Sequence, residues 1–529
     1  MAFARRIGPA LLCAAGLLIA FHPMVLSGFA RTETDPGDTR HLNYVLEHGF
    51  RWLLSRPGHR ELWSPPVFFP EKNTAAYSET LLGVLPFYAP WRLLGAPPDT
   101  ALQILVLALA LLNFPASFFL LRHSLDLGVL ASSMGAFLFS FGSPRLVHVG
   151  HQQLIAQFFT ILAVIALVEL FRASESPEGG SRRRAWIGLL FASLVAQAYA
   201  CFYLAWFLAL ALALALTFAV AVPETRRRLF WLLSRHWLAA ALCGVVSLLA
   251  VAPLAEHYLE AEAVLERPIF RDAAMGLPPL KAWLNLGPYS WLYGSLGRPF
   301  LSDMPFEWEK RLGLGLVTML AATYGLFRQR SRPGVRVLIA TSAALFLLTA
   351  SFPGRHTLWR WVFEFVPGAT AMRAVSRVAL ILLVPASIGL ACAFDRALLK
   401  RRGAWLPALA ALVVLEQGQT MPSYDKRTAR SRVAAVARSI PGGCEAFFAA
   451  FPESSRNVFE TQLDAMWAGL ETGAPTVNGY SSHLPPAWEP LYNNQVRGAG
   501  DAERLRVALR QWLTSRGRDP ERACFVLEP

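Results

Sequence analysis

Two aspartates near the N-terminus have the type and the setting that proton transfer requires. Asp35 and Asp38 stand in the segment RTETDPGDTRHLNY, which directly follows a long apolar stretch. The run from Asp35 to Asp38 predicts a turn, and Asp38 then begins a helix with one apolar face. A carboxylate held beside a helix N-terminus can take a proton from an acceptor hydroxyl. A plain N-cap is the alternative interpretation of Asp38, because helices of any protein favour aspartate there.

Two arginines in the second half of the chain predict an anion-binding site. Arg373 and Arg377 occur in FVPGATAMRAVSRVALILL at the start of an apolar stretch. Their spacing of four places both side chains on one face of a helix, and arginine forks bind phosphate oxygens bidentately. Snorkelling of two long side chains at a helix end is the alternative interpretation.

Further polar and aromatic residues are candidates for contacting a substrate. His148 and His151 share the segment PRLVHVGHQQL, where their spacing would allow metal ligation. No acidic residue or cysteine is adjacent, so hydrogen bonding to a sugar or phosphate, or simple interface polarity, is favoured over zinc. Residues 77–91 predict an interfacial helix, whose aromatic residues could equally form a membrane belt. The candidates are His41, Tyr77, Glu79, Arg145, His148, His151, Gln152, Asn478 and Tyr480.

Long apolar stretches are the elements that position these residues. The chain has 529 residues, of which 54% are hydrophobic and 16% charged, and a mean hydropathy of +0.38. Soluble globular chains carry about 25% charged residues, so a membrane protein is indicated. About eleven stretches between residues 9 and 418 predict membrane spans, although several are short. The first stretch, 9–29, is long for a cleaved signal peptide and predicts a retained helix.

The net charge of +14 is explained by where lysine and arginine lie. Basic clusters such as 182–184 and 226–228 fall on alternate loops, as the positive-inside rule requires. This pattern places the N-terminus in the cytoplasm and the regions 30–98, 255–311 and 420–529 outside. The basic excess therefore orients the chain in a bilayer and does not indicate a nucleic-acid partner.

The outer regions define the expected domains. We expect a transmembrane domain over 1–419, with 30–98 and 255–311 as its large outer loops, and a small extracytoplasmic α/β domain over 420–529. In that domain Cys444 precedes one extended stretch and Cys524 lies in another. If the two strands are neighbours, their separation permits a disulfide, which an oxidising compartment preserves. Two separate buried thiols are the alternative.

This layout resembles the GT-C superfamily of membrane glycosyltransferases. The segments PGDTRHLNY, FFPEKNTAAYSETLLG, PRLVHVGHQQL, MRAVSRV and PTVNGYSSHLPP are similar to a broad group of bacterial members. The resemblance implies an inner-membrane hexosyl- or pentosyltransferase that takes a sugar from a polyprenyl-phosphate donor with inversion. It also implies an acidic base in the first outer loop, with Asp38 as first choice and Asp35 as second, and a glycan, lipid or protein acceptor. The WWDYG motif of oligosaccharyltransferase catalytic subunits is absent, which argues against en bloc transfer to asparagine.

Two other classes of function fit parts of the sequence. A transporter or flippase of lipid-linked glycans would share the arginines and the lipid-facing helices but would not need Asp38 or Asp35. A non-catalytic scaffold of envelope assembly would need neither. No cofactor is required by the sequence, although a divalent metal ion held by Asp35 or Glu79 would assist the departure of a phosphate.

Overall fold

The computed structural model describes residues 2–173, 180–265, 268–301, 303–399, 405–453 and 456–528. The chain is mostly helical and divides into two compact units. Unit 1 consists of Met1–His22, Val106–Val251 and Pro268–Met421, and unit 2 of Pro23–Leu105, Ala252–Arg267 and Pro422–Pro529. The division differs from the sequence expectation, because the first outer loop groups with the C-terminal region and not with the apolar helices.

Six helices in the described part of the chain are long and apolar enough to cross a membrane, and three shorter apolar helices accompany them. The long ones are Ile7–Leu26, Pro98–Ser124, Gln152–Arg172, Phe202–Ala221, Pro223–Val264 and Val375–Asp395. The shorter ones are Leu316–Arg328, Pro333–Thr349 and Leu406–Glu416. The chain is therefore a multi-pass membrane protein.

The expected count of about eleven spans is not reproduced among the described residues. The two remaining expected spans fall on α5 (Val129–Phe141) and α8 (Gly180–Ala200). With 13 residues, α5 is shorter than the roughly 20 residues that a bilayer requires. Helix α8 carries three consecutive arginines close to its start, which lower its apolar character.

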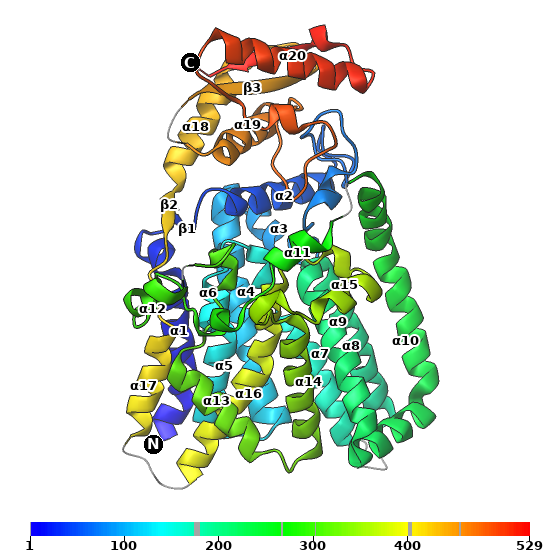
Figure 1. Ribbon diagram of the computed structural model, residues 1–529, viewed down its shortest axis with the longest axis vertical. Coiled ribbons are helices and arrows are strands. Elements are labelled where there is room, and N and C mark those ends of the chain that lie inside the picture. Colours follow the sequence, from blue (N-terminus) through cyan, green and yellow to red (C-terminus); the bar gives the residue numbers. More distant parts are fainter. Residues whose placement is uncertain are drawn as a thin grey trace. The chain divides into compact units, whose positions relative to one another are not determined.

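Helix α16 (Val378–Leu399) lies at the centre of unit 1, and 78% of its most apolar stretch is buried inside the protein. It packs against α5 and against α13 (Leu316–Arg328) (Figure 1). The approach to α13 is close, because a Cβ atom on Gly325 would lie 1.8 Å from the carbonyl oxygen of Gly389. Small residues that let helix backbones approach are typical of packing in membranes. Elsewhere in unit 1, α7 (Phe158–Ala173) packs on α8, and α9 (Phe202–Ala221) packs on α14 (Pro333–Thr349).

The described residues of unit 2 form two small sheets. Strand β1 (Arg31–Glu33) pairs antiparallel with β2 (Ser423–Asp425). The second sheet has the order β4 (Gln495–Val496), β3 (Ala446–Pro452), β5 (Ala523–Leu527), and all its pairs are parallel. The first six residues of β3 are buried, as in a strand covered on both faces.

Three helices of the C-terminal region cover the parallel sheet. They are α18 (Lys426–Ser439), α19 (Val458–Thr472) and α20 (Ala499–Ser515). Successive side chains of β3 alternate between two clusters, with Phe447 packed among residues of α18 and α19 and Phe448 packed among residues of α19 and α20. This alternation is the period of two that a strand imposes.

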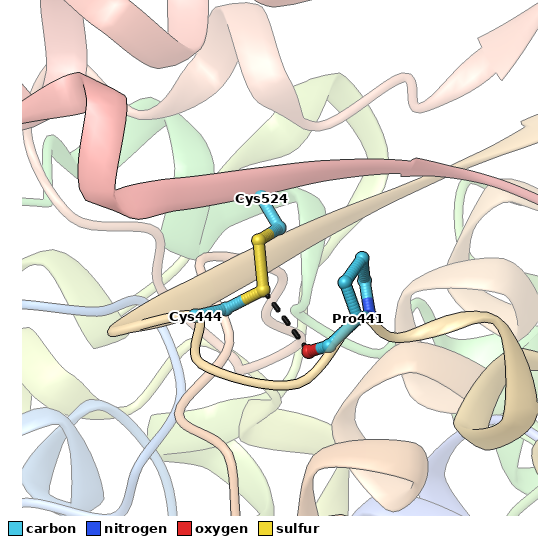
Figure 2. The surroundings of a disulfide bond; sticks show 3 residues. All are labelled: Pro441, Cys444 and Cys524. Atoms are coloured by element: carbon cyan, nitrogen blue, oxygen red, sulfur yellow. Dashed lines mark hydrogen bonds between the residues drawn. A yellow bond between two sulfur atoms is a disulfide. The ribbon is translucent and has the colours of Figure 1, made fainter.

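Cys444 and Cys524 form a disulfide in unit 2, with their Cα atoms 5.7 Å apart (Figure 2). Cys524 lies in β5 opposite Phe447 of β3, and Cys444 stands just before β3. The two cysteines are 80 positions apart in sequence, and the parallel pairing of β3 with β5 brings them together.

Replacing both Cys444 and Cys524 by alanine is expected to lower the free energy of unfolding of unit 2 by on the order of 4 kcal/mol, because a long loop loses its closure. Thermal unfolding of the purified protein in detergent measures the change. The variant Cys243→Ala removes a free cysteine and serves as the control. Thiol labelling of intact and permeabilised cells, with and without reductant, tests the compartment; free thiols that face the cytoplasm would contradict an outer placement.

Candidate functional site

The candidate residues fall into two groups, one in each unit. Unit 2 holds Asp35, Asp38, His41, Tyr77, Glu79, Asn478 and Tyr480, and unit 1 holds Arg145, His148, His151, Gln152, Arg373 and Arg377.

Asp38 is the first residue of α2 (Asp38–Leu53). Gly37 is the N-cap and provides no side-chain cap, so Asp38 does not have the N-cap role that the sequence left open. The Asp38 carboxylate is half-buried, and its Oδ1 accepts a hydrogen bond of 2.7 Å from the hydroxyl of Tyr480. Exposed Asp35 instead accepts a 2.7 Å bond from the Gly37 amide and closes the turn before the helix. Of the two aspartates, Asp38 is the one held by a side chain from the C-terminal region.

Two buried ion-pair systems fix α2 within unit 2. Arg40 pairs with Asp464 of α19 at 2.7 Å, and this carboxylate is fully buried. At the other end of α2, buried Glu47 pairs with Arg92 at 2.7 Å and with Arg51 at 3.0 Å. Because Asp464 and Glu47 are buried, leaving either carboxylate without its arginine partners would be costly, and this requirement ties α2 to its neighbours. The position of Asp38 relative to Tyr480 follows from this anchoring.

His41 lies one turn along α2 from Asp38 and is buried. Its ring meets that of Tyr480 edge to face, with centroids 5.4 Å apart. Neither ring nitrogen of His41 has a hydrogen-bond partner among the described residues. Burial lowers the pKa of His41 to about 4, although the charge of Asp38 acts in the opposite direction. His41, Tyr480 and the apolar Phe68 and Met466 line a small cavity within unit 2.

The other candidates in unit 2 are placed differently from one another. Asn478 is fully buried, and its amide exchanges hydrogen bonds with Ala449 of β3 and donates to Gln462, so its visible role is to tie the sheet to α19. Tyr77 is buried, and burial raises the pKa of its phenol to about 12. Glu79 is half-buried.

The helix expected over residues 77–91 is shorter than the sequence indicates. A 3₁₀ turn ends at Tyr77, and α3 (Leu85–Leu93) begins only after Leu81 has adopted a positive φ of 52°. A leucine in this conformation interrupts a helix, and Pro86 then suits the first turn of a new one.

Arg377 of unit 1 is buried and paired. It ends a short 3₁₀ turn, η8 (Val375–Arg377), immediately before α16. Its Nη2 lies 2.8 Å from Glu309 Oε1 and its Nε lies 3.3 Å from Glu309 Oε2, so the guanidinium forks onto the carboxylate. The ring of Tyr203 packs against the guanidinium, 4.7 Å from its central carbon.

Two histidines approach the same carboxylate. His148 Nε2 lies 3.3 Å from Glu309 Oε2, and His151 Nε2 lies 3.5 Å from Oε1. Burial alone would raise the pKa of Glu309, but the charges of Arg377, His148 and His151 outweigh it and hold that pKa well below the usual range. Glu309 was not among the residues that the sequence singled out. The signal that could have found it is general: a buried arginine in an apolar chain needs an acidic partner.

The expectation that Arg373 and Arg377 share one helical face is wrong. Arg373 stands between two short 3₁₀ turns, so no continuous helix joins it to Arg377. Its backbone amide lies 3.2 Å from the hydroxyl of Tyr203, the residue that also packs on Arg377.

Arg145 makes its contacts within the chain itself. Its buried guanidinium donates to the carbonyl oxygens of Phe139 and Leu154 and to the side chain of Gln157. These bonds close the irregular segment between α5 and α7, which carries both histidines. Gln152, in the same segment, donates to the carbonyl oxygen of Val149. Arg145 thereby positions His148 and His151.

The residues present do not form a metal centre in the described part of the chain, where no group of three or more histidine, cysteine or acidic side chains is arranged to hold an ion. Asp35, one of the two ligands considered from the sequence, directs Oδ1 to the Gly37 amide.

Comparison with solved structures identifies the fold. The archaeal oligosaccharyltransferase AglB from Archaeoglobus fulgidus, in complex with an inhibitory peptide and a dolichol-phosphate, matches 96% of this chain at 11% identity with a TM-score of 0.52. The apo form of the Archaeoglobus fulgidus oligosaccharyltransferase matches 90% at 13% identity with a TM-score of 0.55. Both are GT-C glycosyltransferases. The chain has the GT-C fold.

The resemblance drawn from the sequence is thus confirmed for the GT-C fold. The chain spans 69% and 65% of the length of these two oligosaccharyltransferase structures. ArnT from Cupriavidus metallidurans, also a GT-C enzyme, matches at 13% identity over 89% of this chain and 86% of its own, with a lower TM-score of 0.44. No family model and no curated protein sequence matches the chain.

The lowered pKa of His41 predicts that unit 2 loses stability in mild acid. An unfolded histidine takes up a proton near pH 6.5, whereas folded His41 does so only near pH 4. Between these values the unfolded state binds more protons, so stability falls with pH across this window, by up to about 3 kcal/mol. The free energy of unfolding of His41→Asn, measured at pH 7 and pH 4.5, is expected to change less with pH than that of the wild type. The exposed His123→Asn is the control, and equal pH slopes for His41→Asn and wild type would contradict the prediction.

Proposed function

We propose that the protein is an inverting glycosyltransferase of a bacterial inner membrane. It moves a sugar from a polyprenyl-phosphate-linked donor to a hydroxyl of a glycan, lipid or protein acceptor at the outer face. The single observation that carries the proposal is the Asp38 carboxylate, placed at the N-terminus of α2 and held by Tyr480. The GT-C fold supports the class of enzyme.

Asp38 acts on the acceptor. The N-terminal end of a helix favours a negative charge, and the Tyr480 hydroxyl fixes one carboxylate oxygen. Asp38 removes the proton of the acceptor hydroxyl while that oxygen forms a bond to the anomeric carbon of the sugar. The bond between this carbon and the phosphate oxygen breaks on the opposite side, and its electron pair leaves with the polyprenyl phosphate.

Arg377 acts on the donor phosphate. A buried guanidinium presents a fork that matches two phosphate oxygens, and its fixed positive charge stabilises the negative charge that the leaving phosphate gains. Arg373 adds a second positive charge to the same segment of chain. AglB was solved with a dolichol-phosphate, which belongs to the chemical class of polyprenyl phosphates. The isoprenoid tail of the donor would lie among the apolar helices.

Asp38→Asn is expected to lower the rate of transfer at least about 100-fold, because it removes the base and keeps a side chain of the same size. The measurement is release of undecaprenyl phosphate from a panel of undecaprenyl-phosphoryl monosaccharides, with cell-envelope extract as the source of acceptor. The matched control is Asp35→Asn, which should retain most of the activity. Loss of activity in Asp35→Asn alone would make Asp35 the base, and full activity in both variants would exclude the enzyme and favour a transporter or a scaffold.

Tyr480→Phe is expected to slow transfer about tenfold with little change in KM, because one hydrogen bond to a charged group is lost. The ring, its contact with His41 and the local packing are retained. Tyr492→Phe removes a hydroxyl from a tyrosine near Tyr480 and is the control. A rise in KM at unchanged kcat would instead assign Tyr480 to substrate binding.

A further inference from the structure

Glu309 is surrounded as a bound anion would be. One guanidinium nitrogen and one imidazole nitrogen approach each of its two oxygens: Arg377 Nη2 and His151 Nε2 at Oε1, Arg377 Nε and His148 Nε2 at Oε2. Two guanidinium N–H donors and two imidazole nitrogens, which donate when their rings are protonated, thus face the two oxygens of one anion. Charge-assisted donors of this kind also bind phosphate oxygens.

A second observation concerns His148, whose buried Nε2 atom forms no hydrogen bond within the described part of the chain. Its Nδ1 lies 2.7 Å from the carbonyl oxygen of Pro144, which can only accept, so Nδ1 carries a proton, and Nε2 donates to an anion when the ring is protonated there as well. The side chain is 3% exposed, and Nε2 faces Glu309 without the alignment of a hydrogen bond. A buried polar nitrogen without an aligned partner is costly. An anion with oxygens on more than two sides, such as phosphate, could meet it better than a planar carboxylate.

We propose that Glu309 occupies, in the donor-free protein, the place that a phosphate group takes when it binds, and that Arg377, His148 and His151 together form the phosphate-binding site. This inference rests on the proposed function, since it names the residues that receive the phosphate of the donor. Glu309 then acts as an internal competitor that leaves as the phosphate enters.

The surroundings of Glu309 limit this movement to its side chain. Its neighbours are anchored: Lys310 donates to the carbonyl oxygens of Met275 and Pro305, both at 2.7 Å, and Glu307 pairs with Arg311 at 2.7 Å. The Glu309 side chain itself is 13% exposed, beside the largely exposed Trp308. Glu309 can therefore turn toward solvent while the backbone of its 3₁₀ turn, η5 (Glu307–Lys310), stays in place.

The test measures binding of undecaprenyl phosphate to the full chain in nanodiscs, without turnover. Glu309→Gln is expected to bind about tenfold more tightly than the wild type, because the competing negative charge is gone. Arg377→Ala is expected to bind at least about tenfold more weakly. The matched control is Glu307→Gln, which removes a neighbouring carboxylate that pairs with Arg311 and should bind like the wild type. Undecaprenol and inorganic phosphate, tested in parallel, separate recognition of the lipid from recognition of the phosphate.

Glu309→Gln also removes the partner of a buried arginine, so the variant could fold poorly. The variant Glu309→Asp keeps the charge on a shorter side chain and should bind between the wild type and Glu309→Gln. Weaker or unchanged binding by a folded Glu309→Gln would overturn the inference and make Glu309 a contributor to the site or a purely structural residue. Equal affinity for undecaprenol would overturn it as well. Absence of binding by the wild type and by every variant would overturn the donor class itself, and with it the proposed function.

Discussion

Asp464 is a fully buried carboxylate, and the arrangement of unit 2 depends on the arginines that compensate its negative charge. Arg40 of α2 approaches it at 2.7 Å and Arg456 at 3.3 Å, while Arg432 of α18 lies at 3.7 Å. Segments that are distant in sequence, those of Arg40 and Arg432, must converge on one side chain, because a buried charge left without partners would cost several kcal/mol. The first turn of α2 is thereby tied to α19, and with it the position of Asp38. Packing alone would allow α2 to slide or rotate, whereas a directed ion pair fixes it.

In unit 1, charged side chains have a different role: they form hydrogen bonds with backbone groups at helix ends and in irregular segments. The carboxylate of Glu416 accepts from the amides of Val317 and Thr318 and so satisfies the start of α13. Arg145 and Lys310 donate to carbonyl oxygens of irregular segments. Buried backbone groups without partners are costly, so irregular chain is buried only where other groups of the protein pair it. This requirement explains why so many ionisable side chains of unit 1 contact backbone.

The features that could be predicted from the sequence are those with a local signal. The apolar runs indicated the long helices, and the turn before Asp38 placed the start of α2 at the residue where it begins. Arg377 could be recognised by type, but its partner Glu309 is 68 positions away and shows no periodic relation to it. The expected helix through Arg373 failed because the backbone is irregular at this position, and the helix expected from Tyr77 failed at Leu81. Long-range pairing and positive φ angles leave little trace in local composition.

A buried arginine that serves a transient anion faces a physical conflict. Without the ligand its charge needs another partner, since water is excluded and the guanidinium stays protonated. A resident carboxylate such as Glu309 resolves the conflict in the free protein, but the ligand must then break an existing ion pair, and its apparent affinity falls accordingly. In the proposed transferase, which must also release polyprenyl phosphate after transfer, this lowered affinity would be useful, because the carboxylate that competes with entry also competes with retention. The same pair that completes the fold of this segment would thus set the balance between binding the donor and releasing its product.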